Sequence, residues 1–448
     1  MDGLSRQYIR ETNKLTYDRL SEEVITRAKK CIIHQMACTA PMRDEKWGVA
    51  ASDYVRSTSG GGRATVWFSG VKCNAFEAVL ANTTTGSSLI QEDIHREDGI
   101  HPGCIIVPCA IAMGEQYGLS GKAVIESIVK GYQFLCRVGK CVVTSEFNSR
   151  GFRPTTIMGP FANAVTAGSL LGLSEDELVS AVGIAGNFSC GVNEWAHTGA
   201  SEVYFQNGFS AAGGILAAEA AKRGVTGSES ILEGSDGSCN AYGLSKEALY
   251  SSVKNDDVLE ICKVVFKGAP TCNFNQGAAA LALLAANDGV RPEDIESGTL
   301  WTNTRGTLYP GVDSIGPFDT TMQAKMSQQY TFAALLTYGK PVNDAFRDYH
   351  NGQILNLVSR LKLRSKPEYD LIYPARMQGE VELVMKDGGV LHYKTEEGNF
   401  YNNEQVDEGF RYYFSQIYDS ARVDSLLDML NNLESLDNIQ KLGELLGA

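Results

Sequence analysis

Long stretches of the first 260 residues carry apolar and small side chains at helical spacing. The segments 105–118, 120–136, 160–173 and 209–223 are rich in Ala, Gly and Ile. Apolar side chains that recur every three to four residues predict helices, and small residues such as those of FSAAGGILAAEAA (209–221) let neighbouring helices approach closely. We therefore expect a large helical bundle, in which these glycines and alanines serve core packing.

Two of the expected helices also have recognisable N-terminal signals. In LSEEVITRAKKCIIHQM (20–36), Ser21 is a suitable N-cap and acids occupy the first turn, where the helix dipole favours them. In LSEDELVSAVGIAG (173–186), Ser174 and Glu177 have the spacing of a capping box. These signals predict that helices start directly after Ser21 and Ser174.

The pattern changes after about residue 262. ESGTLWTNT (296–304) has β character. The segment 379–395 alternates apolar and polar side chains on both sides of Asp387-Gly388-Gly389, which predicts a β-hairpin. Strands are therefore expected mainly in this later part of the chain.

Helical patterns surround and follow these strands. QQYTFAALLTYG (328–339) and NGQILNLVSRLKL (351–363) predict helices within the later part, and a leucine-rich helical pattern continues from NEQVDEGFRYYF to the end. The expected fold is mainly α, with a large all-α domain over 1–262 plus 403–448. A smaller α+β domain over 263–402 is inserted into it.

Composition excludes several classes of protein. A net charge of −13, a pI near 5.1 and the lack of a dense Lys/Arg cluster argue against a nucleic-acid partner. The N-terminal segment lacks the apolar core of a secretory signal, and no run of about 18 apolar residues predicts a membrane span. The 11 cysteines are scattered singly without a CxxC pair, which favours reduced thiols and a cytoplasmic protein.

The stretch QEDIHREDGIHPG (91–103) concentrates two of the six histidines, His95 and His101, among acids and an arginine. Its spacing matches no common metal site, and Gly99 and Pro102 interrupt any local helix. We therefore expect no metal here, although histidine and four acids offer possible ligands: Glu92, Asp93, Glu97 and Asp98.

Proton transfer is the chemistry that this stretch favours instead. Histidine titrates near neutral pH, and a neighbouring carboxylate can orient its ring and change its pKa. His101 stands directly before Pro102 and an apolar segment that begins like a helix, so it should lie at a helix N-terminus. The structural alternative is that His101 only caps that helix and that His95 is solvated.

Three further segments supply candidate residues. Arg150 and Arg153 precede a small-residue helix, and arginine at such a place suits bidentate binding of a carboxylate; an exposed salt bridge is the alternative, more so for Arg150. Lys267 lies in a Phe-Lys-Gly-Ala-Pro turn where the chain changes character, and a lysine at a domain junction can face a cleft. Tyr330 opens an apolar helix, where core packing is the usual role of a tyrosine.

Taken in order, these segments resemble the MmgE/PrpD family of dehydratases, decarboxylases and epimerases of small polycarboxylates. The resemblance covers nearly the full chain and rests on an ordered set of segments: HPG…VPCAIAMGE, GFRPTTIMGPFANAVTAGSLLGLSEDEL, the Phe-Lys-x-x-Pro turn at 266–270, SQQYTFAALL and YPARMQGEVELVMKDGGVL. It implies a large all-α domain, a small α/β domain, an active site in the cleft between them, a homodimer and cofactor-free chemistry.

The resemblance also implies roles for individual residues. It places Asp93, His101, Lys267 and Tyr330 at catalytic positions, with Asp93 orienting or accepting and His101 exchanging the proton. Arg153, together with His95, is expected to bind substrate. Arg153 stands where decarboxylase members have a second histidine, and no lysine occurs near 202–203, where those members have one. These two departures argue against cis-aconitate decarboxylation, and methylcitrate dehydration has no specific support.

The expected function is removal of a proton, or of carbon dioxide, next to a carboxylate of a small di- or tricarboxylate. A lyase is the first expectation because lyases are frequent in the family. An epimerase of an amino- or imino-dicarboxylate such as iminodisuccinate is the alternative, since one intermediate serves both outcomes. A catalytically silent ligand-binding homologue is the third possibility, given the two departures.

Overall fold

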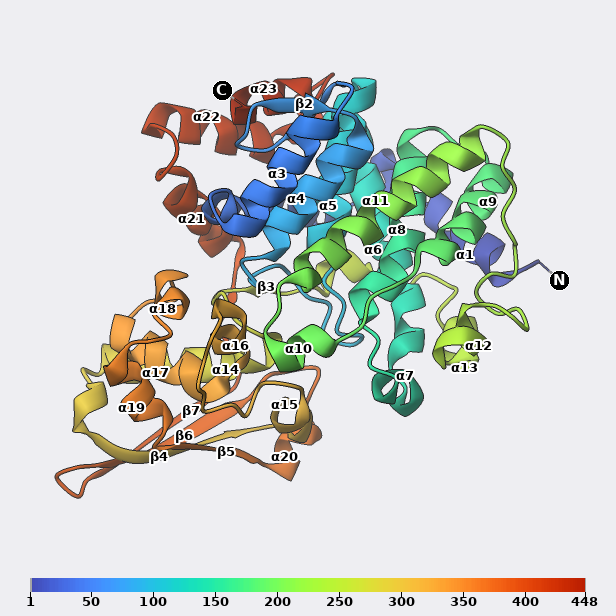
Figure 1. Ribbon diagram of the computed structural model, residues 1–448. Coiled ribbons are helices and arrows are strands. Elements are labelled where there is room, and N and C mark those ends of the chain that lie inside the picture. The colour runs from blue at the N-terminus through green and yellow to red at the C-terminus, as the bar shows by residue number, and fades with distance from the viewer. Residues whose placement is uncertain (1, 448) are drawn as a thin grey trace.

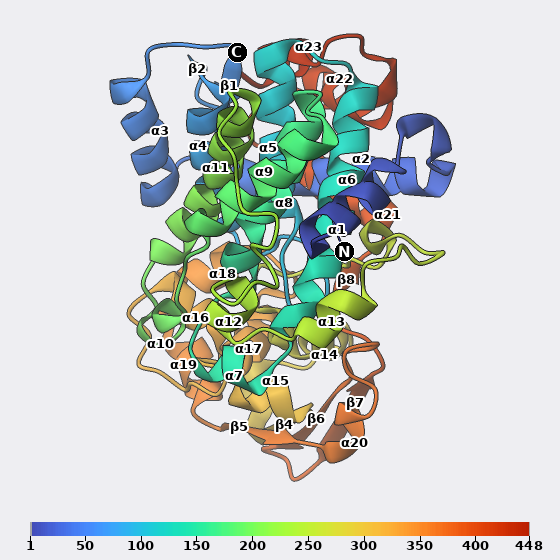
Figure 2. The same cartoon turned by 90° about the vertical axis from the view of Figure 1, so that its right-hand side faces the viewer.

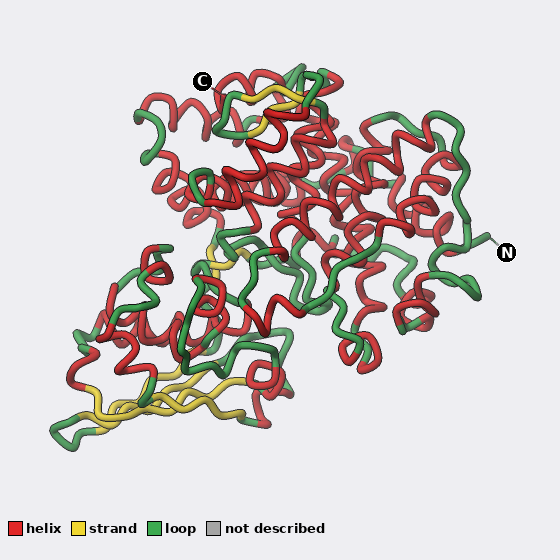
Figure 3. The backbone as a smooth tube through the Cα atoms, viewed as in Figure 1, coloured by secondary structure: helices red, strands yellow, loops and turns green. Residues whose placement is uncertain are grey.

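The structure is a computed structural model that describes residues 2–447, and it shows a mainly α fold with a smaller α+β part. A large helical body and a smaller body that contains a sheet lie side by side (Figure 1). Figure 3 shows that strands gather in the smaller body, apart from short pairs elsewhere. The predicted fold class is thus confirmed.

Helices from both ends of the chain build the large body. From the first 262 residues these are α1 (Leu4–Asn13), α2 (Glu22–Thr39), α3 (Lys46–Thr58), α4 (Ala75–Ser87), α5 (Gly103–Tyr117), α6 (Gly121–Gly139), α7 (Ser145–Ser149), α8 (Pro154–Leu170), α9 (Glu175–Ala185), α10 (Glu194–Thr198), α11 (Glu202–Lys222), α12 (Ser238–Tyr242) and α13 (Lys246–Ser251). The last three helices return to this body in both views (Figures 1 and 2): α21 (Asn403–Phe414), α22 (Ser420–Asn431) and α23 (Gln440–Gly447).

Caps and small residues shape these helices as the sequence predicts. The Ser21 hydroxyl accepts the Val24 N–H at the start of α2, and Ser174 and Glu177 form the capping box of α9. Helix α11 packs on α8 because Gly214 lacks a side chain: a Cβ there would lie 2.4 Å from the Asn163 Cβ. Close helix packing is therefore confirmed.

The C-terminal helices share the hydrophobic core of the large body. Val406 and Leu426 belong to the same buried cluster as Ile32 of α2, and Lys30 of α2 pairs with Asp407 of α21 at 2.6 Å. A separate buried cluster lies within 269–383. On this basis we propose the division into 1–262 plus 403–448 and 263–402.

The small body is a four-stranded sheet with helices on one face (Figure 1). The strand order is β5-β4-β6-β7, and only the β4–β5 pair is parallel. The strands are β4 (Ile295–Thr302), β5 (Leu361–Ser365), β6 (Gly379–Met385) and β7 (Val390–Thr395). The helices are α14 (Gln276–Asn287), α15 (Thr304–Leu308), α16 (Thr321–Met326), α17 (Gln328–Tyr338), α18 (Asp344–Arg347), α19 (Gly352–Val358) and α20 (Pro367–Asp370).

Two short strands tie the bodies together. Strand β3 (Phe266–Lys267) pairs antiparallel with β8 (Phe400–Tyr401), with Lys267 opposite Phe400. The two chain crossings between the bodies therefore lie side by side, and Lys267 sits at the junction, as its place in the sequence suggests.

Two local predictions differ from the structure. The helix expected over 351–363 ends at Val358, and Leu361–Ser365 forms β5 instead, because its alternating apolar and polar side chains suit one sheet face. A small hairpin of β1 (Ala64–Val66) and β2 (Val71–Cys73) interrupts the helical part. No helix of the described residues has both the length and the apolar character that crossing a bilayer requires.

Candidate active site

A cavity lies where the two bodies meet, and side chains from both bodies line it. The large body contributes Glu92, His101, Asn148, Arg153, Trp195 and Val203. The junction and the small body contribute Lys267, Cys272, Arg305, Tyr309, Met326 and Tyr373. The cavity therefore combines titratable and cationic groups with aromatic and apolar walls.

The loop between α4 and α5 carries Glu92 and His101, and a backbone bridge fixes the centre of this loop. Ile94 forms an antiparallel bridge with Val265, just before β3. His95 pairs with Ile100, and the chain reverses through Gly99, whose φ of +73° favours glycine. This short hairpin returns the chain to His101 at the edge of the cavity.

His101 is held as a neutral imidazole. Its Nδ1 lies 2.8 Å from the Asp93 carbonyl oxygen, which can only accept, so Nδ1 carries the proton and Nε2 keeps its lone pair. Burial lowers the pKa of His101 to about 4, and the cationic Lys267 and Arg153 act in the same direction against Glu92. At neutral pH, His101 can therefore accept a proton.

Glu92 lies between His101 and Lys267. Its Oε1 is 3.6 Å from His101 Nδ1 and its Oε2 is 3.5 Å from Lys267 Nζ. Burial alone would raise the pKa of Glu92, but Lys267, His101 and Arg153 hold it below its usual value. Lys267 Nζ also donates to the Ile90 carbonyl oxygen at 2.6 Å. A carboxylate and an ammonium thus meet beside the imidazole.

Two arginines, Arg153 and Arg305, line the cavity from opposite bodies. Arg153 is the N-cap residue of α8, and its guanidinium donates to Asn207 and lies 5.7 Å from the Trp195 ring. Arg305 belongs to α15. Neither forms an ion pair with any residue in 2–447. Unpaired arginines at a cavity provide positive charge for an anionic ligand.

Asp93 acts beside the cavity rather than in it. Its Oδ1 accepts the Gly103 N–H at 2.7 Å at the start of α5, and its Oδ2 accepts the Tyr132 hydroxyl at 2.7 Å. Burial raises the pKa of Asp93 to about 6. The structure thus gives the helix-capping contact to Asp93, while its carbonyl orients His101.

His95 lies fully buried below the loop, outside the cavity lining, so the solvated alternative is wrong. Its Nδ1 is 2.9 Å from Asp98 Oδ2 and its Nε2 is 3.0 Å from Glu260 Oε2. Although burial opposes it, Asp98 and Glu260 raise the pKa of His95 to about 10. This imidazolium joins the loop to the segment that leads into β3.

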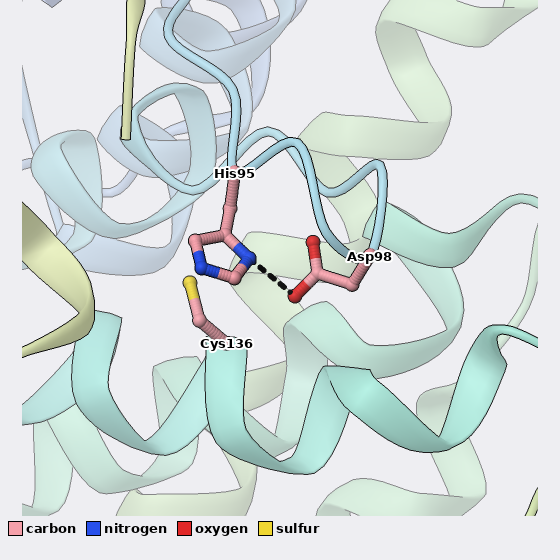
Figure 4. A group of neighbouring side chains, drawn as sticks. All are labelled: His95, Asp98 and Cys136. Carbon is pink, nitrogen blue, oxygen red and sulfur yellow. Dashed lines mark ion pairs between the residues drawn. The ribbon is translucent and has the colours of Figure 1, made fainter. Parts of the chain in front are cut away.

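His95 also belongs to the two residue groups whose geometry could hold a metal. One contains Asp98 and Cys136, shown in Figure 4, and the other contains Glu97 and Glu260. Both nitrogens of His95 lie 2.9 and 3.0 Å from carboxylate oxygens, so a metal would have to displace a ring proton and one of these contacts. This donor set fits an ion network better than a metal.

The structure places the other candidates away from the cavity. Tyr330 is buried in the small body, where its hydroxyl donates to the Ala345 carbonyl oxygen at 3.0 Å and its ring packs on Phe318 and Phe346. Arg150 is an exposed residue that pairs with Glu146 at 2.5 Å. Both follow the structural alternatives given above.

Several cavity residues are not among those that the sequence predicts for the site. The sequence predicts Glu92 only as a possible metal ligand, yet Glu92 lines the cavity and Asp93 does not. Neighbouring residues of an extended segment point in opposite directions. Arg305 follows β4 in a segment without a distinctive motif. Val203 lines the cavity in the region where the resemblance expects a lysine.

The geometry defines a two-body helical protein with a polar junction cavity suited to a small anion. The MmgE/PrpD N-terminal domain matches residues 8–250, and the MmgE/PrpD C-terminal domain matches residues 270–434. The chain belongs to the MmgE/PrpD family.

Proteins named cis-aconitate decarboxylase are similar over the full length. The one from Aspergillus terreus is 22% identical over 477 residues, covering 100% of this chain and 96% of its own. The Homo sapiens protein is 23% identical over 472 residues, covering 100% and 95%. The Mus musculus protein is 22% identical over 453 residues, covering 96% and 91%.

Proposed function

We propose that this chain is a cofactor-free lyase that acts next to a carboxylate of a small di- or tricarboxylate. One observation carries the proposal: the junction cavity joins the neutral His101 to three cationic side chains, Lys267, Arg153 and Arg305. The decarboxylase names of the relatives support the reaction class. A homodimer is part of the proposal on the family resemblance alone.

His101 exchanges the proton in this proposal. In a dehydration, Nε2 takes the proton from the carbon next to the carboxylate, the C–H electron pair forms the double bond, and the departing hydroxide is protonated to water. In a decarboxylation, the C–C bond breaks to release carbon dioxide, and the carbanion takes a proton from His101 Nε2 after that nitrogen has been protonated by solvent. Both routes build negative charge on the remaining carboxylate, which fixed cations stabilise.

The cationic groups set the substrate class. Lys267 lies against Glu92, so Arg153 and Arg305 remain to bind carboxylates of the substrate. Their positions on opposite bodies suit a ligand with at least two carboxylates. Because Arg153 replaces a histidine and Val203 lies where a lysine is expected, cis-aconitate is a compound to test rather than the assigned substrate.

An epimerase is the second candidate. Epimerisation needs a base on each side of the reacting carbon, and His101 and Lys267 come from different elements to line the same cavity. The shared intermediate is then reprotonated on its opposite face. Analysis of the product distinguishes this outcome from elimination.

A thermal-shift screen followed by product analysis tests the proposed function. We expect at least one acid derived from citrate, aconitate, succinate or aspartate to raise the melting temperature and to be converted. Stabilisation without conversion would favour the silent ligand-binding homologue. If no acid of the panel stabilises the protein or is converted, the proposal is wrong.

Removal of either arginine should mainly weaken substrate binding. A charged hydrogen bond contributes about 1.5–3 kcal/mol, so Arg153→Ala and Arg305→Ala should each raise KM by roughly 10- to 100-fold. The change in kcat should be smaller because a carboxylate clamp acts in ground and transition states alike. Steady-state kinetics check this. Arg150→Ala is the matched control, and an equal effect of all three variants would contradict the assignment.

The low pKa of His101 predicts a flat pH profile where an ordinary histidine would titrate. In the routes where His101 takes the proton, dehydration and epimerisation, its imidazole must be neutral, so activity is lost only as pH falls through its pKa of about 4. Between pH 5.5 and 7.5, kcat/KM should change less than about twofold, whereas a histidine of ordinary pKa would change it about tenfold. An acid limb near pH 6.5 would contradict the environment of His101.

A further inference from the structure

Three successive carbonyl oxygens directly before Glu92 each accept a hydrogen bond from a different basic side chain. Lys325 Nζ donates to the Leu89 oxygen at 2.8 Å, and Lys267 Nζ donates to the Ile90 oxygen at 2.6 Å. His34 Nε2 lies 2.8 Å from the Gln91 oxygen. The donors come from the small body, the junction and the large body, so this backbone is fixed from three sides.

The fixed segment has an unfavourable backbone conformation. Ile90 has a φ of +62°, which is a rare region for a β-branched side chain. Such a residue persists only when its surroundings determine its conformation. The next residue but one is Glu92, whose carboxylate lies against His101 and Lys267.

Among these three donors, Lys325 is a buried lysine with no role in the proposed reaction. It lies on α16, is only 1% exposed and does not line the cavity. It forms no ion pair with a residue in 2–447. Burial lowers the pKa of Lys325 to about 7, partly offset by Glu45 and Glu92 and aided by Arg347 and Lys267.

The main chain of Lys325 is as firmly held as its side chain. Its carbonyl oxygen accepts the Thr271 hydroxyl at 2.7 Å, the Cys272 N–H at 3.1 Å and the Asn275 side-chain amide at 3.1 Å. Thr271 and Cys272 follow shortly after Lys267. One residue thus connects α16, the segment after β3 and the loop that carries Glu92.

We propose that Lys325 is a positioning residue, which holds the Leu89–Gln91 backbone from the small body and so keeps Glu92 beside His101. This inference rests on the proposed function for its kinetic consequence, but not for its structural one. The buried amino group of Lys325 costs desolvation, and its hydrogen bond to the Leu89 carbonyl links the position of the small body to the geometry of the acid–base loop.

Lys325→Met tests the inference, because methionine keeps most of the side-chain length and lacks the donor. A misplaced catalytic group costs up to about 100-fold, so kcat should fall about 10- to 100-fold while KM stays within about twofold. Lys340→Met, at an exposed lysine of the same body, should behave as wild type. Lys325→Gln, which keeps a donor on a shorter side chain, replaces the methionine variant if that variant does not fold.

Hydrogen exchange gives a second readout that does not require activity. The amides of Ile94 and His95 are protected by the Val265 and Ile100 carbonyls. In Lys325→Met their exchange should become about tenfold faster, while α5 remains as protected as in wild type. If the wild-type protein shows no activity on any acid of the panel, the proposed function is wrong. The comparison of hydrogen exchange between wild type and Lys325→Met still tests the positioning role.

Two results would overturn the inference. One is wild-type kcat together with wild-type exchange at Ile94 and His95. The other is an unchanged kcat together with a lower melting temperature and faster exchange throughout the protein. In that case Lys325 would stabilise the fold as a whole without positioning Glu92.

Discussion

Replacing His101 by alanine should lower kcat by about 100-fold or more and leave the fold intact. The neutral imidazole, held by the Asp93 carbonyl, is the group that exchanges the proton in the proposed reaction, and a positioned acid–base group contributes typically about 10²–10⁴ in rate. The Asp93 carboxylate already accepts the Gly103 N–H at the start of α5, so the variant loses no helix cap. Steady-state kinetics and a melting curve measure the two effects separately.

His350→Ala is the matched control, because His350 is an exposed histidine of the small body. It should keep wild-type kcat. If His101→Ala also turns over at the wild-type rate, with a stability change of about 1 kcal/mol or less, His101 is only a structural residue and the proposed site is wrong.

Replacing Lys267 by methionine should also lower kcat by about 100-fold or more. Its ammonium contacts Glu92 and holds the Ile90 carbonyl, so the variant leaves a buried carboxylate without its nearest cation. The pKa of Glu92 should then rise, and the developing substrate charge loses a stabilising group. The buried carbonyl left without a donor should cost about 1–3 kcal/mol of stability.

Lys254→Met, at an exposed lysine shortly before the junction, controls for the loss of a positive charge. The fall in kcat of Lys267→Met should be larger than its loss of stability accounts for, because Lys267 and Glu92 line the cavity. A Lys267→Met protein of reduced stability but normal kcat would limit Lys267 to holding the loop.

Local signals account for the parts of the fold that the sequence predicted. Ser21, the Ser174–Glu177 pair and the Asp387-Gly388-Gly389 turn act within a few residues of themselves, so each can be interpreted without the rest of the chain. The β5 strand was missed because its identity depends on pairing with β4, more than 50 residues earlier. Leu361 also keeps the helical spacing of Ile354, Leu357 and Val358, which makes the helix look longer than it is.

The candidate site shows the same contrast between local signals and long-range contacts. His101, Arg153 and Lys267 were found because each stands at a helix start or at the junction, which the sequence marks. The direction of a side chain within such a segment depends on tertiary packing. That is why Glu92 reaches the cavity instead of Asp93.

The positions of two buried candidates, His95 and Tyr330, also depend on tertiary contacts that the sequence does not show. His95 lies beneath the loop because its ring contacts Asp98 and Glu260, and Glu260 is distant in the sequence. Tyr330 opens its helix as expected but points into the core of the small body.

Proton exchange with solvent tests the central claim most directly. The protein is incubated in D2O with each acid of the panel, and ¹H NMR follows the hydrogen on the carbon next to the carboxylate. We predict deuterium at that carbon, or a product formed by its loss, for at least one acid, and neither with His101→Ala. If an acid stabilises the protein yet shows no exchange and no product, the cavity binds carboxylates without acid–base chemistry.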